Sequence, residues 1–318
     1  MSERGSRVCV TGGAGFIGVR LVSALLSRGC EVTVLDDLSI GRRERVPAGA
    51  QLLVGDIRDA GAVREALTGC NAVAHLAARV AIRSSFEYAV DDASINVVGT
   101  ASVLRHAIDA GSVKRFVLAS SMAVYADSPA PRPIGEDHAT DPASPYGVSK
   151  LAAERLVRLM CSQAGIGHAV LRLFNTYGPG QSLSPYVGVV TIFVNDLLEG
   201  RSVTIYGDGE QCRDFVHVDD VASAFALALA SERPQGTYNI GTGRATSVNE
   251  IHRRVAAAIG RESVPRYMAA VPGELRYSIA GIEAAGRDLG YAPEHSLDLD
   301  LAPVVQEAAA GVTAAEGA

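Results

Sequence analysis

Short runs of β-branched and other apolar residues alternate with longer amphipathic segments over the first 175 residues of the chain. The runs "RVCVTG", "EVTVLD", "QLLVGD", "AVAHLA", "RFVLAS" and "HAVLRLF" are typical of buried strands. The segments between them predict helices over residues 15–28, 60–68, 96–110 and 146–163. This βαβ alternation predicts an α/β fold with a doubly wound parallel sheet and helices on both faces.

The alternation loosens after residue 175. A loop, "NTYGPGQSLSP", is followed by predicted helices over 188–199, 219–230 and 248–259, with the turn "YGDGEQCRD" and the strand "TYNIG" between them. We expect residues 1–175 to bind a nucleotide and residues 176–318 to form a smaller mixed α/β lobe that binds substrate, with the chain recrossing the first domain near 215–242. The terminal "AAAGVTAAEGA" has no bulky side chain to bury, so a flexible tail is expected from about residue 309.

Composition narrows the possible partners. The formal net charge is -6 and the basic residues form no cluster, which argues against nucleic acid. The polar start "MSERGSR" and the lack of any long apolar stretch predict neither a signal peptide nor a membrane span, so we expect a cytoplasmic protein. The five cysteines are widely spaced, without C-x-x-C or a histidine at ligand spacing, so no metal site and no disulfide framework is expected.

The stretch "VCVTGGAGFIG" places Gly12, Gly15 and Gly18 between the first strand and the first helix. Without side chains there, backbone N–H groups can approach a pyrophosphate, whose charge the helix dipole favours. Asp36 ends the second strand, where a carboxylate can bind both ribose hydroxyls and would repel a 2′-phosphate. The pattern predicts a Rossmann domain that binds NAD rather than NADP.

Tyr146 and Lys150 are four residues apart in "YGVSK", so a helix places them on one face. A neighbouring ammonium lowers the pKa of a phenol from about 10 toward neutrality, which would make Tyr146 a usable base. The pair "SS" at 120–121 ends a predicted strand and can supply a hydroxyl to the same site. His75, at the end of another strand, is more typical of a packed core histidine than of a catalyst.

These motifs, in this order, resemble the extended short-chain dehydrogenase/reductases, specifically the NAD-dependent nucleotide-sugar epimerase/dehydratase family, and are most like its UDP-glucose 4-epimerases. The resemblance covers nearly the whole chain, from "TGGAGFIG" through "SSMAVYA", "YGVSK", "LRLFNTYGPGQ" and "GDGEQCRDFVHVDD" to "NIGTG". It implies that Tyr146 is the base, that Lys150 tunes it and binds the nicotinamide ribose, and that Ser121 binds the reacting sugar hydroxyl, with Ser120 structural.

The same resemblance, together with the residues at the ends of the predicted strands, implies further contacts to the cofactor and to the substrate. The expected cofactor contacts, besides the glycines, Asp36, Tyr146 and Lys150, are Phe16, Ile17, Asp37, Ser39, Asp56, Ile57, Leu76, Ala77, Ala78, Asn96 and Phe174. The expected contacts to a nucleotide-sugar substrate, of which a UDP-sugar is favoured, are Ser121, Asn175, Arg213, Ser278 and Arg83. The family pairs the helices near Asn96 and Tyr146 with those of a second subunit, which implies a homodimer.

The residues after Ser121 bear on the reaction. Family members that resemble 4,6-dehydratases have an Asp-Glu pair there and sugar-uronate decarboxylases have a Glu, whereas this chain has Met122 and Ala123, which neither accept nor donate a proton. The remaining chemistry is hydride transfer with one base. We therefore expect a 4-epimerase that oxidises the sugar at C4 and retains its NAD, acting on a UDP-hexose, a UDP-N-acetylhexosamine or a UDP-uronate.

Several alternatives stay open at this point. A nucleotide-4-ketosugar reductase would use the same three residues and release its cofactor, while a dehydratase and a non-catalytic dinucleotide-binding protein are disfavoured by Met122 and by the presence of Tyr146 and Lys150. Epimerases usually have an Arg two residues before a "GD" motif, where this chain has Val271, with Glu274 for the Asp. Arg276 or Arg266 could replace that arginine. Ser278 could admit an N-acetyl group or merely suit an edge strand, and Arg83 could bind a uronate carboxylate or solvent.

Overall fold

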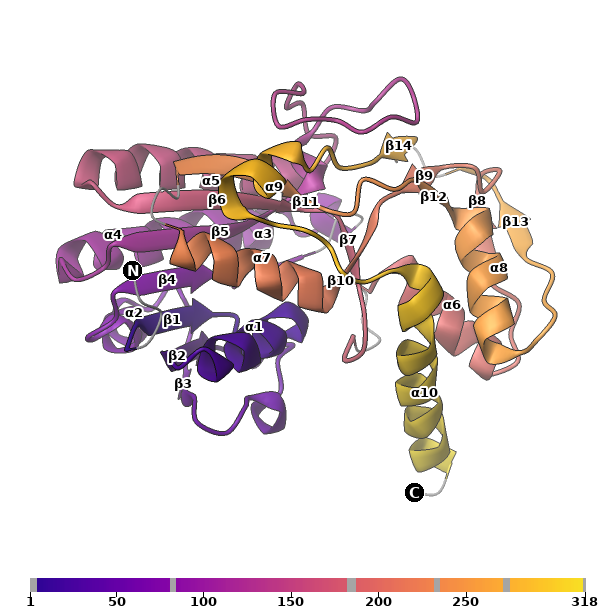
Figure 1. Ribbon diagram of the computed structural model, residues 1–318, viewed down its shortest axis with the longest axis horizontal. Coiled ribbons are helices and arrows are strands. Elements are labelled where there is room, and N and C mark those ends of the chain that lie inside the picture. The colour runs from indigo at the N-terminus through magenta and orange to yellow at the C-terminus, as the bar shows by residue number, and fades with distance from the viewer. Residues whose placement is uncertain (1–4, 81–83, 182–186, 232–234, 271–274, 317–318) are drawn as a thin grey trace.

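Seven strands pair into one parallel sheet, in the order β11-β6-β5-β4-β1-β2-β3 (Figure 1). The computed structural model describes residues 5–80, 84–181, 187–231, 235–270 and 275–316, and side chains up to 310. The sequence predicts all seven strands, and the doubly wound α/β fold is confirmed. Their bounds are β1 (Arg7–Thr11), β2 (Glu31–Asp36), β3 (Gln51–Val54), β4 (Ala72–His75), β5 (Arg115–Ser121), β6 (Gly167–Leu173) and β11 (Gln235–Ile240).

Helices cover both faces of this sheet, which is why its strands are nearly continuous apolar runs. One face packs against α1 (Phe16–Ser27), α7 (Val218–Ala230) and α9 (Glu283–Leu289). The other packs against α2 (Ala60–Leu67), α4 (Thr100–Ala110) and α5 (Pro145–Ala164). The chain thus returns to the sheet through α7 and β11 after it has entered the smaller lobe.

A separate apolar core holds the smaller lobe together, and Figure 1 shows its helices beyond the edge of the sheet. This core is built from α6 (Val189–Leu198), α8 (Val248–Ile259) and α10 (Leu297–Glu316). Short strands complete the lobe: β7 (Asn175–Tyr177) with β10 (Phe215–His217), β8 (Thr204–Tyr206) with β13 (Arg266–Met268), and β12 (Thr246–Ser247), β9 (Cys212–Arg213) and β14 (Tyr277–Ser278) together. The helix α10 runs to Glu316, so residues 309–316 are helical here. The expected flexibility of the tail stays a prediction, as does the domain boundary at 175.

The predicted helix 96–110 begins earlier than expected. It starts as α3 (Ala89–Ala93), continues through a π-helical turn, η3 (Ser94–Gly99), and becomes α4 at Thr100. In the π turn the Asn96 side chain bonds the backbone of Arg79, and a Cβ on Gly99 would lie 2.4 Å from Ile57 Cδ1. The extra residue in the turn therefore lets this helix pass close to the strand ends that carry the expected site.

No helix in the described part of the chain is both long and apolar enough to cross a membrane.

His75, at the end of β4, is a packed core residue with both ring nitrogens occupied. Its Nδ1 lies 2.7 Å from Thr11 Oγ1 and its Nε2 lies 3.0 Å from Thr100 Oγ1. Burial, and then the charge of Lys150, lower the pKa of His75 to about 3.

We predict that His75 makes the protein acid-labile. An unfolded histidine takes up a proton below about pH 6.5 while the folded one does not, so the unfolded state binds more protons and the free energy of unfolding falls as the pH is lowered. Between pH 6.5 and 4.5 this loss is about 2 to 3 kcal/mol. Urea unfolding of the wild type and of His75→Gln measures it: the variant should lose this part of the pH dependence. The matched change His106→Gln on α4 should leave it in place, and equal slopes for wild type and His75→Gln would contradict the assignment.

Candidate active site

The first turn of α5 carries Tyr146 and rests on the segment that follows β5. Ser144 caps the helix by accepting the Gly147 N–H at 3.1 Å, and Pro145 occupies the first helical position. A Cβ on Gly147 would lie 2.2 Å from the carbonyl oxygen of Ala123. Only glycine allows this contact, which brings Tyr146 up to the end of β5.

The three expected catalytic side chains come together there. Ser121 ends β5 and caps the short helix η4 (Met122–Val124), with its Oγ accepting the Ala123 N–H at 3.2 Å. The Ser121 side chain lies close enough to Tyr146 to oppose the rise in the pKa of its phenol. Tyr146 and Lys150 are each 4 % exposed and Ser121 is 9 % exposed, so the three groups share a nearly dry site.

The electrostatics of this site differ from the sequence expectation. Burial raises the pKa of Tyr146 to about 12, the Ser121 side chain opposes the rise, and the charge of Asp92 adds to it. Burial also lowers the pKa of Lys150 to about 8, against the effect of Glu154. The phenol pKa is therefore not lowered toward neutrality, because desolvation of the phenolate outweighs the favourable interactions around it.

The glycine turn lies at the switch point of the sheet, where β1 is flanked by β2 and β4. A Cβ on Gly12 would lie 2.7 Å from the Ala77 backbone nitrogen, and one on Gly18 would lie 2.2 Å from the Gly12 oxygen. No side-chain hydrogen bond caps α1, so its first backbone N–H groups are open to a ligand. Together with the glycine turn, Gly12 to Gly18, they form a cradle for the cofactor that no side chain of the described residues fills. This geometry fits a dinucleotide pyrophosphate.

Asp36 closes the same cradle from the end of β2. Its two carboxylate oxygens accept the N–H groups of Ala14 at 3.0 Å and of Leu38 at 2.9 Å, which ties the glycine turn to the second strand. Burial raises the pKa of Asp36 although these N–H groups oppose the rise. A carboxylate at this position suits a ribose diol better than a 2′-phosphate.

The other expected cofactor residues surround this edge of the sheet. Phe16 and Ile17 open α1, Leu76 to Ala78 follow β4, and Phe174 follows β6 as a buried residue. Several carry local bonds of their own: Asp37 accepts the N–H and hydroxyl of Ser39, and Asp56 pairs with Arg58 beside the buried Ile57. Asn96 donates to Ser149 of α5 at 3.0 Å, so it joins the π turn to the catalytic helix.

The substrate residues lie in the short strands of the smaller lobe. Arg213 on β9 and Ser278 on β14 are register partners, so they stand side by side, 7 % and 1 % exposed. Asn175 begins β7, next to the seven-stranded sheet, and its N–H donates to the Asp214 carbonyl at 3.0 Å. Arg276 is held by both oxygens of Asp208 at 2.7 and 2.9 Å, and Arg266 is exposed on β13. Arg83, Val271 and Glu274 lie outside the described residues.

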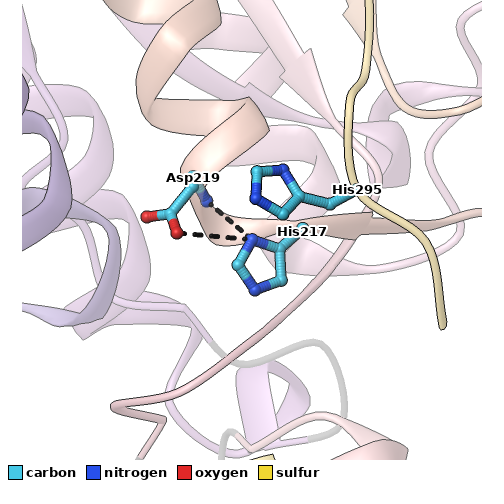
Figure 2. Close-up of side chains that lie close together, drawn as sticks. All are labelled: His217, Asp219 and His295. Carbon is cyan, nitrogen blue, oxygen red and sulfur yellow. Dashed lines mark hydrogen bonds and ion pairs between the residues drawn. The ribbon is translucent and has the colours of Figure 1, made fainter. Parts of the chain in front are cut away.

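One group with metal-ligand atoms within 4.8 Å of one another occurs among the described residues, namely His217, Asp219 and His295 (Figure 2). The sequence did not indicate it, because His295 comes from a segment far along the chain. The two rings are stacked at 4.3 Å with 19° between their planes, so their in-plane lone pairs lie in nearly parallel planes and do not converge on one point. His217 Nδ1 accepts the Asp219 N–H and His295 Nδ1 pairs with Asp220. The group fits a helix cap that ties residue 295 to α7.

Glu154 and Arg172 are the buried ion pair that the sequence analysis missed. They lie on α5 and β6 with side chains 0 % and 4 % exposed, and Arg172 Nη2 is 2.8 Å from Glu154 Oε2. The signal that could have found them is the spacing of Lys150 and Glu154, which is one helical turn. Glu154 lies on the same helix face as Tyr146 and Lys150, and that face is buried. A charged side chain is rarely buried unless it is paired with an opposite charge.

The sheet order, the glycine cradle and the buried Ser121, Tyr146 and Lys150 define a Rossmann-type enzyme of the extended short-chain dehydrogenase/reductase class. A model of the NAD dependent epimerase/dehydratase family matches residues 8–241, and the chain belongs to this family. The expected family and the expected cofactor, NAD, are thereby confirmed.

Individual relatives agree with this assignment. The chain is 37 % identical over 306 residues to a UDP-glucose 4-epimerase of Mycolicibacterium smegmatis, covering 94 % of this chain and 97 % of that protein. A Thermotoga maritima UDP-glucose 4-epimerase solved with UDP-glucose superposes with a TM-score of 0.92 at 34 % identity, over 96 % of this chain and 99 % of that one. The Thermus thermophilus UDP-glucose 4-epimerase complex with NAD gives 0.88 at 36 % identity, over 95 % and 98 %.

We predict that Gly147→Ala separates Tyr146 from Ser121. The new methyl group would overlap the Ala123 oxygen, so α5 must move off η4 at a cost of about 2 kcal/mol. A displacement of about 1 Å can lower kcat by ~100-fold. Steady-state kinetics and thermal unfolding measure both effects. Gly286→Ala in α9, where the nearest atom would be 3.4 Å away, is the matched control, and a fully active Gly147→Ala enzyme would contradict the prediction.

Proposed function

We propose that this protein is a nucleotide-sugar 4-epimerase that acts on a UDP-sugar and keeps its NAD bound. The observation that carries the proposal is the buried set of Ser121, Tyr146 and Lys150 beside the cofactor cradle, followed in η4 by Met122 and Ala123 rather than acids. The names of the relatives support it. Family members that resemble 4,6-dehydratases have an acidic pair at the positions of Met122 and Ala123, and neither of these side chains exchanges protons.

The residues of the chain divide the work of the reaction. NAD, when bound, supplies the acceptor and donor of a hydride at sugar C4. Tyr146 would be the base that takes the proton of the 4-hydroxyl as C4 is oxidised, and Ser121 would hydrogen-bond the same oxygen. Because burial raises the pKa of Tyr146 to about 12, the phenol needs a nearby positive charge to act as a base at neutral pH, and Lys150, one helical turn away, would supply it. The 4-keto sugar would then rotate within the site so that its other face meets the cofactor, and Tyr146 would return the proton to the C4 oxygen when C4 is reduced again.

The smaller lobe would hold the nucleotide while the sugar turns. Arg213 is the buried cation next to Ser278, and a guanidinium suits a diphosphate because it offers several donors in one plane. Asn175 has a buried side-chain oxygen without a hydrogen-bond partner among the described residues at the junction of the two lobes, and we expect it to contact the substrate. These assignments rest on position and on the family resemblance. Because Ser278 is small and buried, both a hydroxyl and an N-acetyl group are compatible with it at C2 of the sugar.

We predict that Tyr146→Phe abolishes epimerisation. Loss of the base lowers kcat by at least ~100-fold, while NAD and UDP-sugar binding remain. Interconversion of UDP-glucose and UDP-galactose, and of their N-acetyl forms, is the assay, and NAD released by denaturation is counted per subunit. Full activity in Tyr146→Phe would refute the mechanism. A wild type that turns over only with added NADH and a 4-keto sugar would instead be a reductase.

We further propose a homodimer formed through α5 and the neighbouring η3–α4 helix. Val148 and Leu159, three helical turns apart on one face of α5, are 55 % and 69 % exposed, and Val98 on η3 is 57 % exposed. Apolar side chains gathered on adjacent helices favour a symmetric contact with a second copy. The cytoplasmic location expected from the sequence stays a prediction.

The dimer predicts that Leu159→Glu yields a monomer. A charge at the centre of an apolar contact is costly to bury, so the self-association constant should fall by at least ~100-fold. Light scattering coupled to size-exclusion chromatography measures the mass. Leu299→Glu on α10, where the leucine is 75 % exposed, is the control that should leave the mass unchanged. A wild type that runs as a monomer would refute the proposal.

A further inference from the structure

Glu154 and Arg172 form a bidentate ion pair at the centre of the fold. Arg172 Nε donates to Glu154 Oε1 at 2.9 Å and Nη2 donates to Oε2 at 2.8 Å. The hydroxyl of Ser120 donates to the same Oε1 at 2.5 Å. Burial disfavours the charged guanidinium, but the hydrogen bonds and charge of Glu154 outweigh it, so the pKa of Arg172 is raised.

The pair is connected to the catalytic set from both sides. Glu154 follows Lys150 by one turn of α5, and Ser120 is the residue before Ser121 on β5. The Arg172 guanidinium lies 4.6 Å over the ring of Tyr125, the residue that follows η4. The carboxylate therefore bonds the strand that ends in the catalytic serine while standing on the helix that carries the catalytic tyrosine and lysine.

The network continues into the next strand of the sheet. Arg172 Nη1 donates to the Glu136 carbonyl at 3.2 Å, and the Tyr125 hydroxyl donates to Asn239 Oδ1 on β11 at 2.6 Å. Helix α5 and strands β5, β6 and β11 are thus joined by directional bonds beneath the site. Apolar packing alone would hold them together but would define their relative rotation less sharply.

Stability alone does not account for such a pair. Replacement of a buried ion pair by apolar residues of similar volume is often neutral or stabilising, because two charges need not then be desolvated. A bidentate pair does restrict geometry, since both its distance and its plane are set. It also places the Glu154 carboxylate one helical turn from Lys150.

We propose that Glu154 is a positioning residue for the reaction: its carboxylate holds Ser120, and through it the end of β5 that carries Ser121, in place against α5, one helical turn from the Lys150 ammonium. The inference rests on the proposed 4-epimerase function for its kinetic consequences. Its structural and electrostatic consequences do not depend on the substrate.

The charge of Lys150 is finely balanced by its surroundings. Tyr146 and Glu154 face it from α5, His75 faces it from β4 and stays neutral because its pKa is lowered to about 3, and Asp92 on α3 acts on Tyr146. Arg172 lies behind Glu154 on β6. Burial lowers the pKa of Lys150 to about 8 and Glu154 opposes this. Removal of the carboxylate would therefore lower the pKa of Lys150 further.

The chain offers a direct measurement, because Lys114 and Lys150 are its only lysines. In protein labelled with 13C at lysine Cε, two lysine signals are expected, and Lys114→Arg assigns them. Titration of the Lys150 signal reports its pKa without any substrate. The variants are Glu154→Gln, the conservative Glu154→Asp, and the double change Glu154→Leu with Arg172→Met. Asp109→Asn, which removes the acid of an exposed pair with Arg105 on α4, is the matched control.

We expect the Lys150 pKa to fall in Glu154→Gln and in the double variant, and to be largely restored in Glu154→Asp. The alkaline limb of the pH profile of kcat should move to lower pH with it, because activity is lost as Lys150 deprotonates. At pH 8, kcat should fall by ~10- to 100-fold while KM for UDP-glucose changes little. Asp109→Asn should match the wild type.

The double variant separates positioning from structure. It has no unpaired buried charge and should fold even if Glu154→Gln does not. A thermally stable double variant with wild-type kcat and an unchanged Lys150 pKa would overturn the inference. A wild type inactive on every UDP-sugar would overturn the proposed function instead, while a lowered Lys150 pKa in the same variants would still support the role of Glu154.

Discussion

Parallel pairing of β1 with both β2 and β4 is the constraint on which the rest of the structure depends. Because all seven strands run the same way, their carboxyl ends meet at one edge. The glycine turn after β1, Asp36 after β2 and Ser121 after β5 are brought to that edge by pairing alone. The two helical layers then cover both faces of the sheet, and the smaller lobe follows from the carboxyl edge.

Burial gives the catalytic side chains their chemical character. Tyr146 and Lys150 are almost fully buried, and desolvation favours the neutral form of each. It raises the pKa of Tyr146 and lowers that of Lys150. A buried acid such as Glu154 counteracts this for the lysine. The same low exposure strengthens any interaction made with a bound substrate, since water no longer screens it. The site therefore requires paired charges behind it as much as reactive groups within it.

The smaller lobe is built from strand pairs that are distant in sequence. Arg213 and Ser278 become neighbours because β9 and β14 pair in parallel, although 65 positions separate them. The stacked His217 and His295 likewise join α7 to the segment before α10. Strands of two or three residues leave too little periodicity for a sequence pattern to show them. These contacts depend on the packing of α6, α8 and α10 around a separate core.

Local patterns determined much of this protein by themselves. The apolar runs predicted the seven strands, the glycines and Asp36 predicted the cofactor cradle, and the spacing of Tyr146 and Lys150 placed them on one helix face, because each signal is contained within a few neighbouring residues. Tertiary structure decided what depends on contact between distant segments. It raised the phenol pKa that the sequence led us to expect lowered, added a π turn before α4, and paired Glu154 with Arg172. Burial and long-range pairing are properties of the packed chain, so no single segment carries them.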